Sequence, residues 1–353
     1  MPSSPRGSNS ISPPAAHAEL VEQLLEALAP RDRKLARDLI QGAVDLVAHE
    51  PATLDLKIAA AAVNEMDDAY QMFKLVDGTD KVTVFGSART QLHDPLYEQA
   101  REVAAQLAGA GWMVITGAGP GIMHAAMEGA GREKSIGVSI RLPNEQGANP
   151  VIAGDHKYVS MKYFFTRKLM LIKESKAFIC LPGGFGTLDE TFELLTLTQT
   201  GKGVPVPIVF LDVPGDPYWE TVHELIEQQL VARGLASPSD TELYMVTDSC
   251  EAAIAEVTNF YRNYDSLRYV GSTLVIRVRF APTDAELADL NQRFSHLCSE
   301  GSIRVVEAFP VERKENDLVD LPRLALVFGQ HKYGDLRAMI DAINDFGTGT
   351  VPA

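Results

Sequence analysis

The sequence has few cysteines, and their spacing argues against the sites that cysteines commonly build. The 353-residue chain contains three, Cys180, Cys250 and Cys298, with no CxxC pair. An odd and widely spaced set does not make a disulfide framework, and the eight histidines show no zinc-binding spacing. We therefore expect a protein of the reducing cytoplasm without a structural metal site.

Long apolar runs are also missing. No stretch reaches the roughly 18 apolar residues that a membrane-spanning helix needs, so we expect no membrane association. The Ser- and Pro-rich residues 1–16 lack the apolar segment of a secretory signal and have little to bury. We expect them to form a disordered tail.

Positive charge is scarce relative to negative charge. Lys and Arg number 32 against 47 Asp and Glu, which gives a formal net charge of −15. Positive charge favours binding to the phosphates of nucleic acids, so nucleic acids are not expected partners. The net charge still allows local basic pockets. The 46% hydrophobic content is ample for a core, and the length suggests about two domains.

Residues 17–79 are predicted to form a helical module. Apolar residues recur at helical spacing on both sides of Pro30, where Asp32 is placed to cap the second helix, and a third helix follows Pro51. No chemistry is visible here, so we interpret the module as a lid or an oligomerisation arm.

Residues 80–265 show a different pattern, in which short apolar strands alternate with helices. Strands are expected at KVTVFG, WMVIT, SIGVSI, AFICL and VPIVFL. Continuous apolar strands are typical of a sheet that is covered on both faces. The alternation predicts an α/β fold, a Rossmann-like doubly wound parallel sheet.

Residues 267–353 are predicted to form a small ferredoxin-like α+β domain. The expected order is strand TLVIRVRF, helix TDAELADLNQRFSHLC, strands IRVVEAFPVE and RLALVFG, and helix GDLRAMIDAIND. We interpret this domain as a dimerisation or packing module.

Loops rich in small residues follow three of the predicted strands, at the sheet edge where open α/β folds bind ligands. They span Gly86–Arg89, Gly117–Gly121 and Pro182–Thr187. Their backbone N–H groups can approach an anion, and the second and third loops lead into helices, whose N-termini favour phosphate. Together the loops predict a phosphate-bearing ligand.

Two common nucleotide motifs do not fit. A dinucleotide fingerprint would need glycine at Ile122, and the strand that follows ends near Arg141 rather than at an acidic residue. No GK[ST] sequence follows the glycines, so the Walker loop is absent as well. An NAD(P)-dependent oxidoreductase is thus a weaker alternative.

Charged residues accompany the third loop. Glu190 and Glu193 are three residues apart in the helix that follows it, so they share one face. Acids in a first turn also suit the helix dipole, and Arg167-Lys168 on the preceding helix would also fit a solvated basic pair. Spacing alone leaves structural and functional roles open.

The segment PGGFGTLDE resembles the PGGxGTxxE signature of the LONELY GUY family, the cytokinin-activating nucleoside 5′-monophosphate phosphoribohydrolases. Arg167-Lys168 matches the family's Arg-Lys pair, and GSAR and TGAGPGIMHAA resemble its other nucleotide loops. The likeness covers about residues 80–262, and His124 replaces the Glu that relatives often carry. Many relatives are labelled lysine decarboxylases, but no pyridoxal-phosphate lysine context is visible.

The resemblance implies that the protein cleaves an AMP-like or cytokinin riboside 5′-monophosphate to free base and ribose 5-phosphate, as a homodimer or higher homo-oligomer without a cofactor. Glu190 would stabilise the oxocarbenium-like sugar and activate water, while Arg167 would hold the substrate and keep Glu190 charged. The implied substrate-binding residues are Gly86, Ser87, Arg89, Gly117, Gly119, Gly121, Met123, Arg141, Lys168, Gly183, Gly184, Gly186, Thr187 and Glu193.

Other functions stay open. A non-catalytic nucleotide sensor could keep the loops and use the C-terminal domain as its output, but it would not need both Arg167 and Glu190. Related folds carry a molybdenum cofactor, so a pterin-like ligand also stays open.

Overall fold

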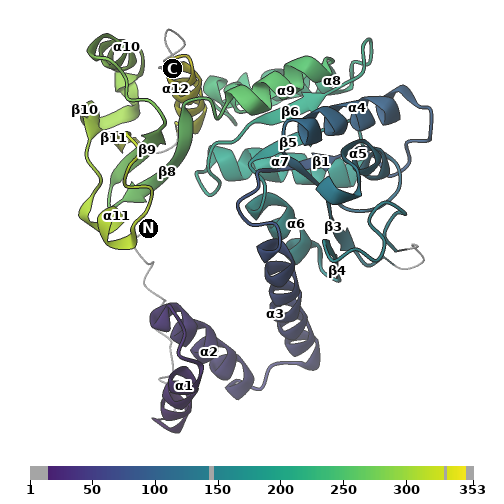
Figure 1. The fold of residues 1–353 in the computed structure, drawn as a ribbon, viewed down its shortest axis with the longest axis vertical. Helices are drawn as coiled ribbons and strands as arrows, with labels where there is room; N and C mark the ends of the chain where they lie inside the picture. Colours follow the sequence, from purple (N-terminus) through teal and green to yellow (C-terminus); the bar gives the residue numbers. More distant parts are fainter. Residues whose placement is uncertain (1–14, 143–146, 330–331, 347–353) are drawn as a thin grey trace. The chain divides into compact units, whose positions relative to one another are not determined.

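The computed structural model describes residues 15–142, 147–329 and 332–346 (Figure 1). The predicted tail, residues 1–16, lies almost wholly outside the described residues. The chain divides into two compact units, Met1–Asp67 and Asp68–Ala353. In the described part, no helix combines the length and apolarity that crossing a bilayer requires.

The first unit is helical, as the sequence predicts. It contains α1 (Ala15–Leu28), α2 (Arg33–Ala48) and the start of α3 (Thr53–Lys74). The Asp32 carboxylate accepts the Leu35 N–H at 3.0 Å, so the predicted cap is confirmed. Arg33 and Arg37 of α2 both pair with Glu22 of α1. The interpretation as a lid or arm stays a prediction.

A parallel sheet forms the centre of the second unit, in the order β4-β3-β2-β1-β5-β6-β7. The chain runs outward from β1 to β4 and then returns to β5 on the other side of β1, so the doubly wound fold is confirmed and its switch point lies between β1 and β5. The strands are β1 (Lys81–Phe85), β2 (Met113–Thr116), β3 (Ser135–Ile140), β4 (Tyr158–Met161), β5 (Ala177–Cys180), β6 (Ile208–Leu211) and β7 (Met245–Thr247).

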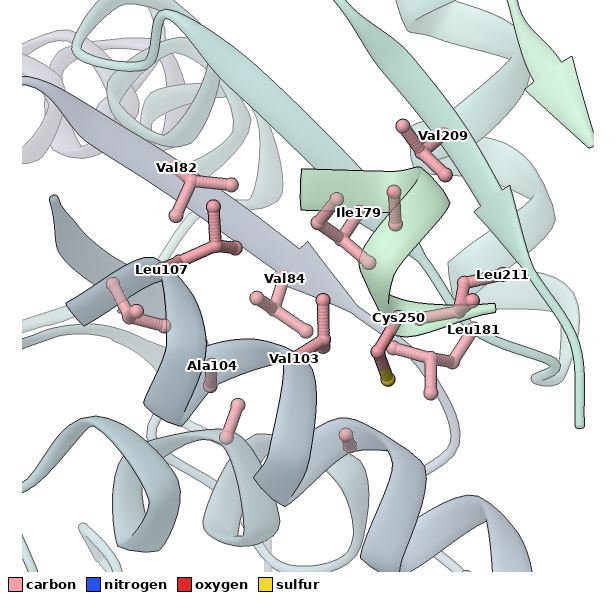
Figure 2. Close-up of a cluster of buried hydrophobic side chains, with 14 of the residues drawn as sticks. Val82, Val84, Val103, Ala104, Leu107, Ile179, Leu181, Val209, Leu211 and Cys250 are labelled. Carbon is pink, nitrogen blue, oxygen red and sulfur yellow. The ribbon is translucent and has the colours of Figure 1, made fainter. Parts of the chain in front are cut away.

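Helices cover both faces of this sheet (Figure 1). On one face, Val84 of β1 and Ile179 of β5 pack with Val103 of α4 and Cys250 of α9 (Figure 2). Each fully buried aliphatic side chain contributes roughly 1.5–3 kcal/mol, so this cluster fixes the strands whose ends carry the glycine loops. The helices are α4 (Pro95–Gly109), α5 (Ile122–Ala130), α6 (Phe164–Lys173), α7 (Phe185–Gln199), α8 (Tyr218–Leu225) and α9 (Cys250–Asn259), with short 3₁₀ or π segments η1 (Arg132–Lys134), η2 (Ile226–Val231) and η3 (Pro238–Leu243).

The C-terminal residues form an antiparallel sheet in the order β10-β11-β9-β8. Strands β9 and β10 flank β11 and are connected through α10, which is the split β-α-β arrangement of ferredoxin-like folds. The elements are β8 (Tyr264–Val270), β9 (Thr273–Val278), α10 (Asp284–Phe294), η4 (Ser295–Leu297), β10 (Cys298–Val306), α11 (Pro310–Glu315), β11 (Arg323–Phe328) and α12 (Tyr333–Asn344).

Two details of the prediction for this region are wrong. No strand is predicted before TLVIRVRF, but β8 precedes it, pairs with β9 and forms one edge of the sheet. The segment IRVVEAFPVE is not one strand, because β10 ends at Val306 and α11 begins at Pro310. Proline at the first position of a helix is favourable, since its missing N–H would have no intrahelical partner there.

Candidate active site

The first glycine loop fastens the other two together. The Ser87 N–H donates to the Pro182 carbonyl at 3.2 Å, and the Ile122 N–H donates to the Ser87 carbonyl at 3.0 Å. The three loops, at the ends of β1, β2 and β5, therefore form one connected surface at the switch point. Because the Ser87 N–H is used within the protein, the contribution we expect from Ser87 to anion binding is its hydroxyl.

The predicted loop glycines fall into two groups. A Cβ on Gly121, whose φ is +66°, would lie 2.3 Å from the Ser87 carbonyl oxygen, so only glycine fits. Gly86 and Gly183 are equally crowded, by Ile122 and Thr187. A Cβ on Gly184 or Gly186 would meet nothing within 4 Å. The first group allows the loops to pack, and the second leaves the start of α7 open to a ligand.

The N-terminus of α7 lies beside the open space at Gly184 and Gly186. The first N–H groups of a helix have no partners within the helix. In the described structure, no side chain caps α7, whose N-cap residue is Gly184. Unpaired N–H groups and the positive end of the helix dipole both favour an anion here.

Arg167 and Glu190 form a buried ion pair behind the loops. Nη1 of Arg167 on α6 lies 2.9 Å from Oε1 of Glu190 on α7, and the two side chains are only 9% and 12% exposed. Nε of Arg167 also donates to the Val138 carbonyl of β3 at 3.0 Å. The arginine is held at two points, so it presents Glu190 in one orientation.

The second loop reaches this ion pair. A Cβ on Gly117 would lie 2.2 Å from Nη2 of Arg167 and 2.7 Å from Sδ of Met123. A Cβ on Gly119 would lie 2.7 Å from Cε of Met123. Gly117, Gly119 and Met123 are thus brought together with Arg167 and Glu190, although they come from different parts of the chain.

Burial controls the ionisation of Glu190. Removal of the carboxyl from water raises its pKa, and this effect outweighs the opposing charge and hydrogen bond of Arg167. Arg167 favours the charged carboxylate, as expected of a neighbouring cation, but burial sets the net direction of the pKa shift. A carboxylate with a raised pKa is a stronger base at neutral pH, which suits proton abstraction from water.

The remaining charged candidates lie elsewhere around the site. Lys168 Nζ pairs with Asp189 Oδ2 at 3.0 Å and with Glu193, so Lys168 and Glu193 balance each other's charge. Arg89 and Arg141 are exposed, in the first loop and after β3. Their roles in substrate binding stay predictions.

Two polar residues that support the loops were not predicted. The Tyr218 hydroxyl donates to the Gly183 carbonyl at 2.8 Å. Asn149 is buried, its Nδ2 donates to the Gly119 carbonyl, and its N–H donates to the Ala118 carbonyl. Both follow the carboxyl end of a strand in a turn-rich segment, which is the one sequence signal that could have pointed to them.

Comparison with known proteins identifies the family. Residues 121–257 match the family described as "Possible lysine decarboxylase". A cytokinin riboside 5′-monophosphate phosphoribohydrolase of Mycobacterium tuberculosis is 30% identical over 187 residues, which are 51% of this chain and 94% of the relative. The chain belongs to the LONELY GUY family. Its named relatives support a phosphoribohydrolase enzyme.

Other similarities are more limited. One of several relatives from Arabidopsis thaliana, a cytokinin riboside 5′-monophosphate phosphoribohydrolase, is 28% identical over 117 residues, which are 33% of this chain and 53% of the relative. The molybdenum cofactor carrier protein of Chlamydomonas reinhardtii shares 21% identity over 51% of this chain and 96% of its own, with a TM-score of 0.35. A score this low decides nothing about the ligand of this chain.

Proposed function

We propose that the protein hydrolyses the N-glycosidic bond of a nucleoside 5′-monophosphate and releases the free base and ribose 5-phosphate. The observation that carries this proposal is the buried pair of Arg167 and Glu190 one helical turn beyond an uncapped, glycine-rich helix start. A protein that only binds nucleotides needs the loops, but it gains nothing from a buried carboxylate fixed by an arginine.

The 5′-phosphate binds at the start of α7 in this proposal. Gly184 and Gly186 leave space there, and the helix dipole attracts the phosphate. Glu190 follows Gly186 by four residues, about 6 Å along the helix axis. A phosphate at the helix start therefore places the attached ribose within reach of Glu190.

Glu190 acts on the sugar and on water. As the bond from C1′ to the base nitrogen breaks, positive charge develops on the ribose, and the carboxylate stabilises it. Glu190 takes a proton from the attacking water, whose oxygen forms the new bond to C1′. The base leaves with the bonding electron pair and takes one proton from solvent, while Glu190 returns the proton of the attacking water to solvent. Arg167 orients Glu190 throughout, and the reaction consumes only water.

Base release from a panel of monophosphates tests the proposal. We expect free base, detected by chromatography, from at least one of AMP, CMP, GMP, IMP, UMP and isopentenyl-AMP, and none from the matching nucleosides, which lack the phosphate. Tight nucleotide binding without release would contradict the proposal and favour a sensor. Hydride transfer from NAD(P)H would favour an oxidoreductase instead.

We also propose a homo-oligomer that uses the face of α6. Phe164, Phe165 and Leu169 expose 54%, 51% and 43% of their surface there. Each of these side chains is already about half covered, so burying the rest would contribute roughly 0.7–1.5 kcal/mol per residue. We expect light scattering to give a mass of at least twice 38.4 kDa, and Phe164→Asp with Phe165→Asp to lower it toward that of one chain. A monomeric native protein would contradict this proposal.

A further inference from the structure

The peptide between Gly183 and Gly184 is the part of the loop Pro182–Thr187 whose orientation is least restricted by its own residues. A trans peptide is planar, so the carbonyl of Gly183 and the N–H of Gly184 point in opposite directions. With glycine on both sides, the backbone has more freedom to rotate this unit than any other residue pair would allow. A rotated peptide would present a carbonyl oxygen, which repels a phosphate, in place of the N–H.

Tyr218 holds that peptide from outside the loop. It is the first residue of α8, and its hydroxyl donates to the Gly183 carbonyl at 2.8 Å. The carbonyl is therefore directed toward α8, which turns the Gly184 N–H toward the opposite side. The space beside Gly184 is open, since a Cβ there would meet nothing within 4 Å.

Tyr218 is itself fixed by its neighbours. The buried Asp212, directly after β6, accepts the Trp219 N–H at 2.9 Å, and Asp216 accepts the Tyr218 N–H at 3.1 Å. The Trp219 ring is fully buried and stacks on Phe210 with their centroids 4.3 Å apart. The first turn of α8 is thus anchored to β6, and the tyrosine hydroxyl has a defined position.

We propose that Tyr218 is a positioning residue for phosphate recognition, which locks the Gly183–Gly184 peptide with its N–H toward the 5′-phosphate. This inference rests on the proposed function, because it assigns the anion at α7 to the substrate. Tyr218 does not contact the substrate in this arrangement. It acts through the Gly183–Gly184 peptide, whose N–H contacts the phosphate.

The test is Tyr218→Phe, which keeps the ring and removes only the hydroxyl. We expect the Kd for ribose 5-phosphate, measured by calorimetry, and the KM for the best monophosphate to rise about tenfold, the effect of one hydrogen bond to a charged group. We expect kcat to stay within about twofold, because the phosphate does not react. The Kd for the matching nucleoside should not change, and the Tm should fall by no more than the few degrees that one lost hydrogen bond costs.

The matched control is Tyr244→Phe. That hydroxyl also lies in this domain and is bonded to Nδ1 of His223, 2.8 Å away, rather than to the loop. We expect it to leave phosphate affinity unchanged.

Two results would overturn the inference. One is unchanged affinity for ribose 5-phosphate in Tyr218→Phe. The other is an equal loss for phosphate and nucleoside with a lowered Tm, which would make Tyr218 merely structural. Calorimetry needs no turnover, so native protein that binds ribose 5-phosphate but releases no base would refute hydrolysis alone. Native protein that does not bind ribose 5-phosphate would refute both.

Discussion

Glu190→Gln is expected to lower kcat for base release by about a thousandfold or more, which corresponds to roughly 4 kcal/mol of transition-state stabilisation. Glutamine has nearly the same shape and can still accept a hydrogen bond from Arg167. It can neither take a proton from water nor offset the charge on the ribose. Ribose 5-phosphate should still bind, because the phosphate contacts lie a turn away. Chromatographic kcat and calorimetric Kd measure the two effects separately.

The control for this variant removes a neighbouring carboxylate. Asp189→Asn changes the same helical turn and the same charge, but Asp189 is 61% exposed and is directed to Lys168. Its kcat should stay close to the native value. If both variants lost activity equally, the loss would reflect the net charge of α7 rather than a reacting group at position 190.

The same carboxyl determines the pH dependence. A base must be ionised to accept a proton, so activity falls as the pH drops through the pKa of Glu190. The ordinary pKa of a glutamate is about 4.3. Burial raises the pKa of Glu190, so the acid limb of the kcat/KM profile should lie at a higher pH than that value. In Glu190→Gln the residual activity should show no such limb.

The sequence predicts central strands far better than edge strands. Strand β5 is buried along its whole length, and its sequence AFIC is a continuous apolar run, so the sequence identifies it as a strand. Strands β4 and β7 end the parallel sheet on either side, and neither was predicted. β7 is three residues long and half-buried throughout, while β4 alternates between buried and half-buried positions. A strand with one neighbour needs no continuous apolar run, so these segments resemble loops.

Site residues in a local motif are likewise easier to predict than those that depend on contacts between distant segments. Arg167 and Glu190 could be placed because their motif is local and their helices are strongly patterned. The contacts of Tyr218 and Asn149 are with backbone carbonyls of distant loops, and only the strand order brings them there. The net direction of the Glu190 pKa shift could not be predicted for a similar reason. It depends on how much water the fold removes, which no spacing of charges reveals.

The geometry around Gly117 leads to the second large effect. Gly117→Ala is expected to lower kcat/KM by about a hundredfold, because a shift of about 1 Å in a catalytic group can cost that much. The new Cβ would lie 2.2 Å from Nη2 of Arg167, so the guanidinium must move. That group is the far end of a flexible side chain, and the protein should therefore still fold. Steady-state kinetics and the Tm together check this expectation.

Gly109→Ala is the matched control, because its Cβ would meet nothing within 4 Å and the residue lies in α4. Alanine is favoured over glycine in a helix by up to about 1 kcal/mol, so the control should keep its activity and melt no earlier. Native activity in Gly117→Ala would show that the position of Arg167 does not matter. If Arg167 is displaced as expected, less positive charge opposes the effect of burial on Glu190. The pKa of Glu190 then rises further, and the acid limb of the Gly117→Ala profile should move to higher pH than in the native enzyme.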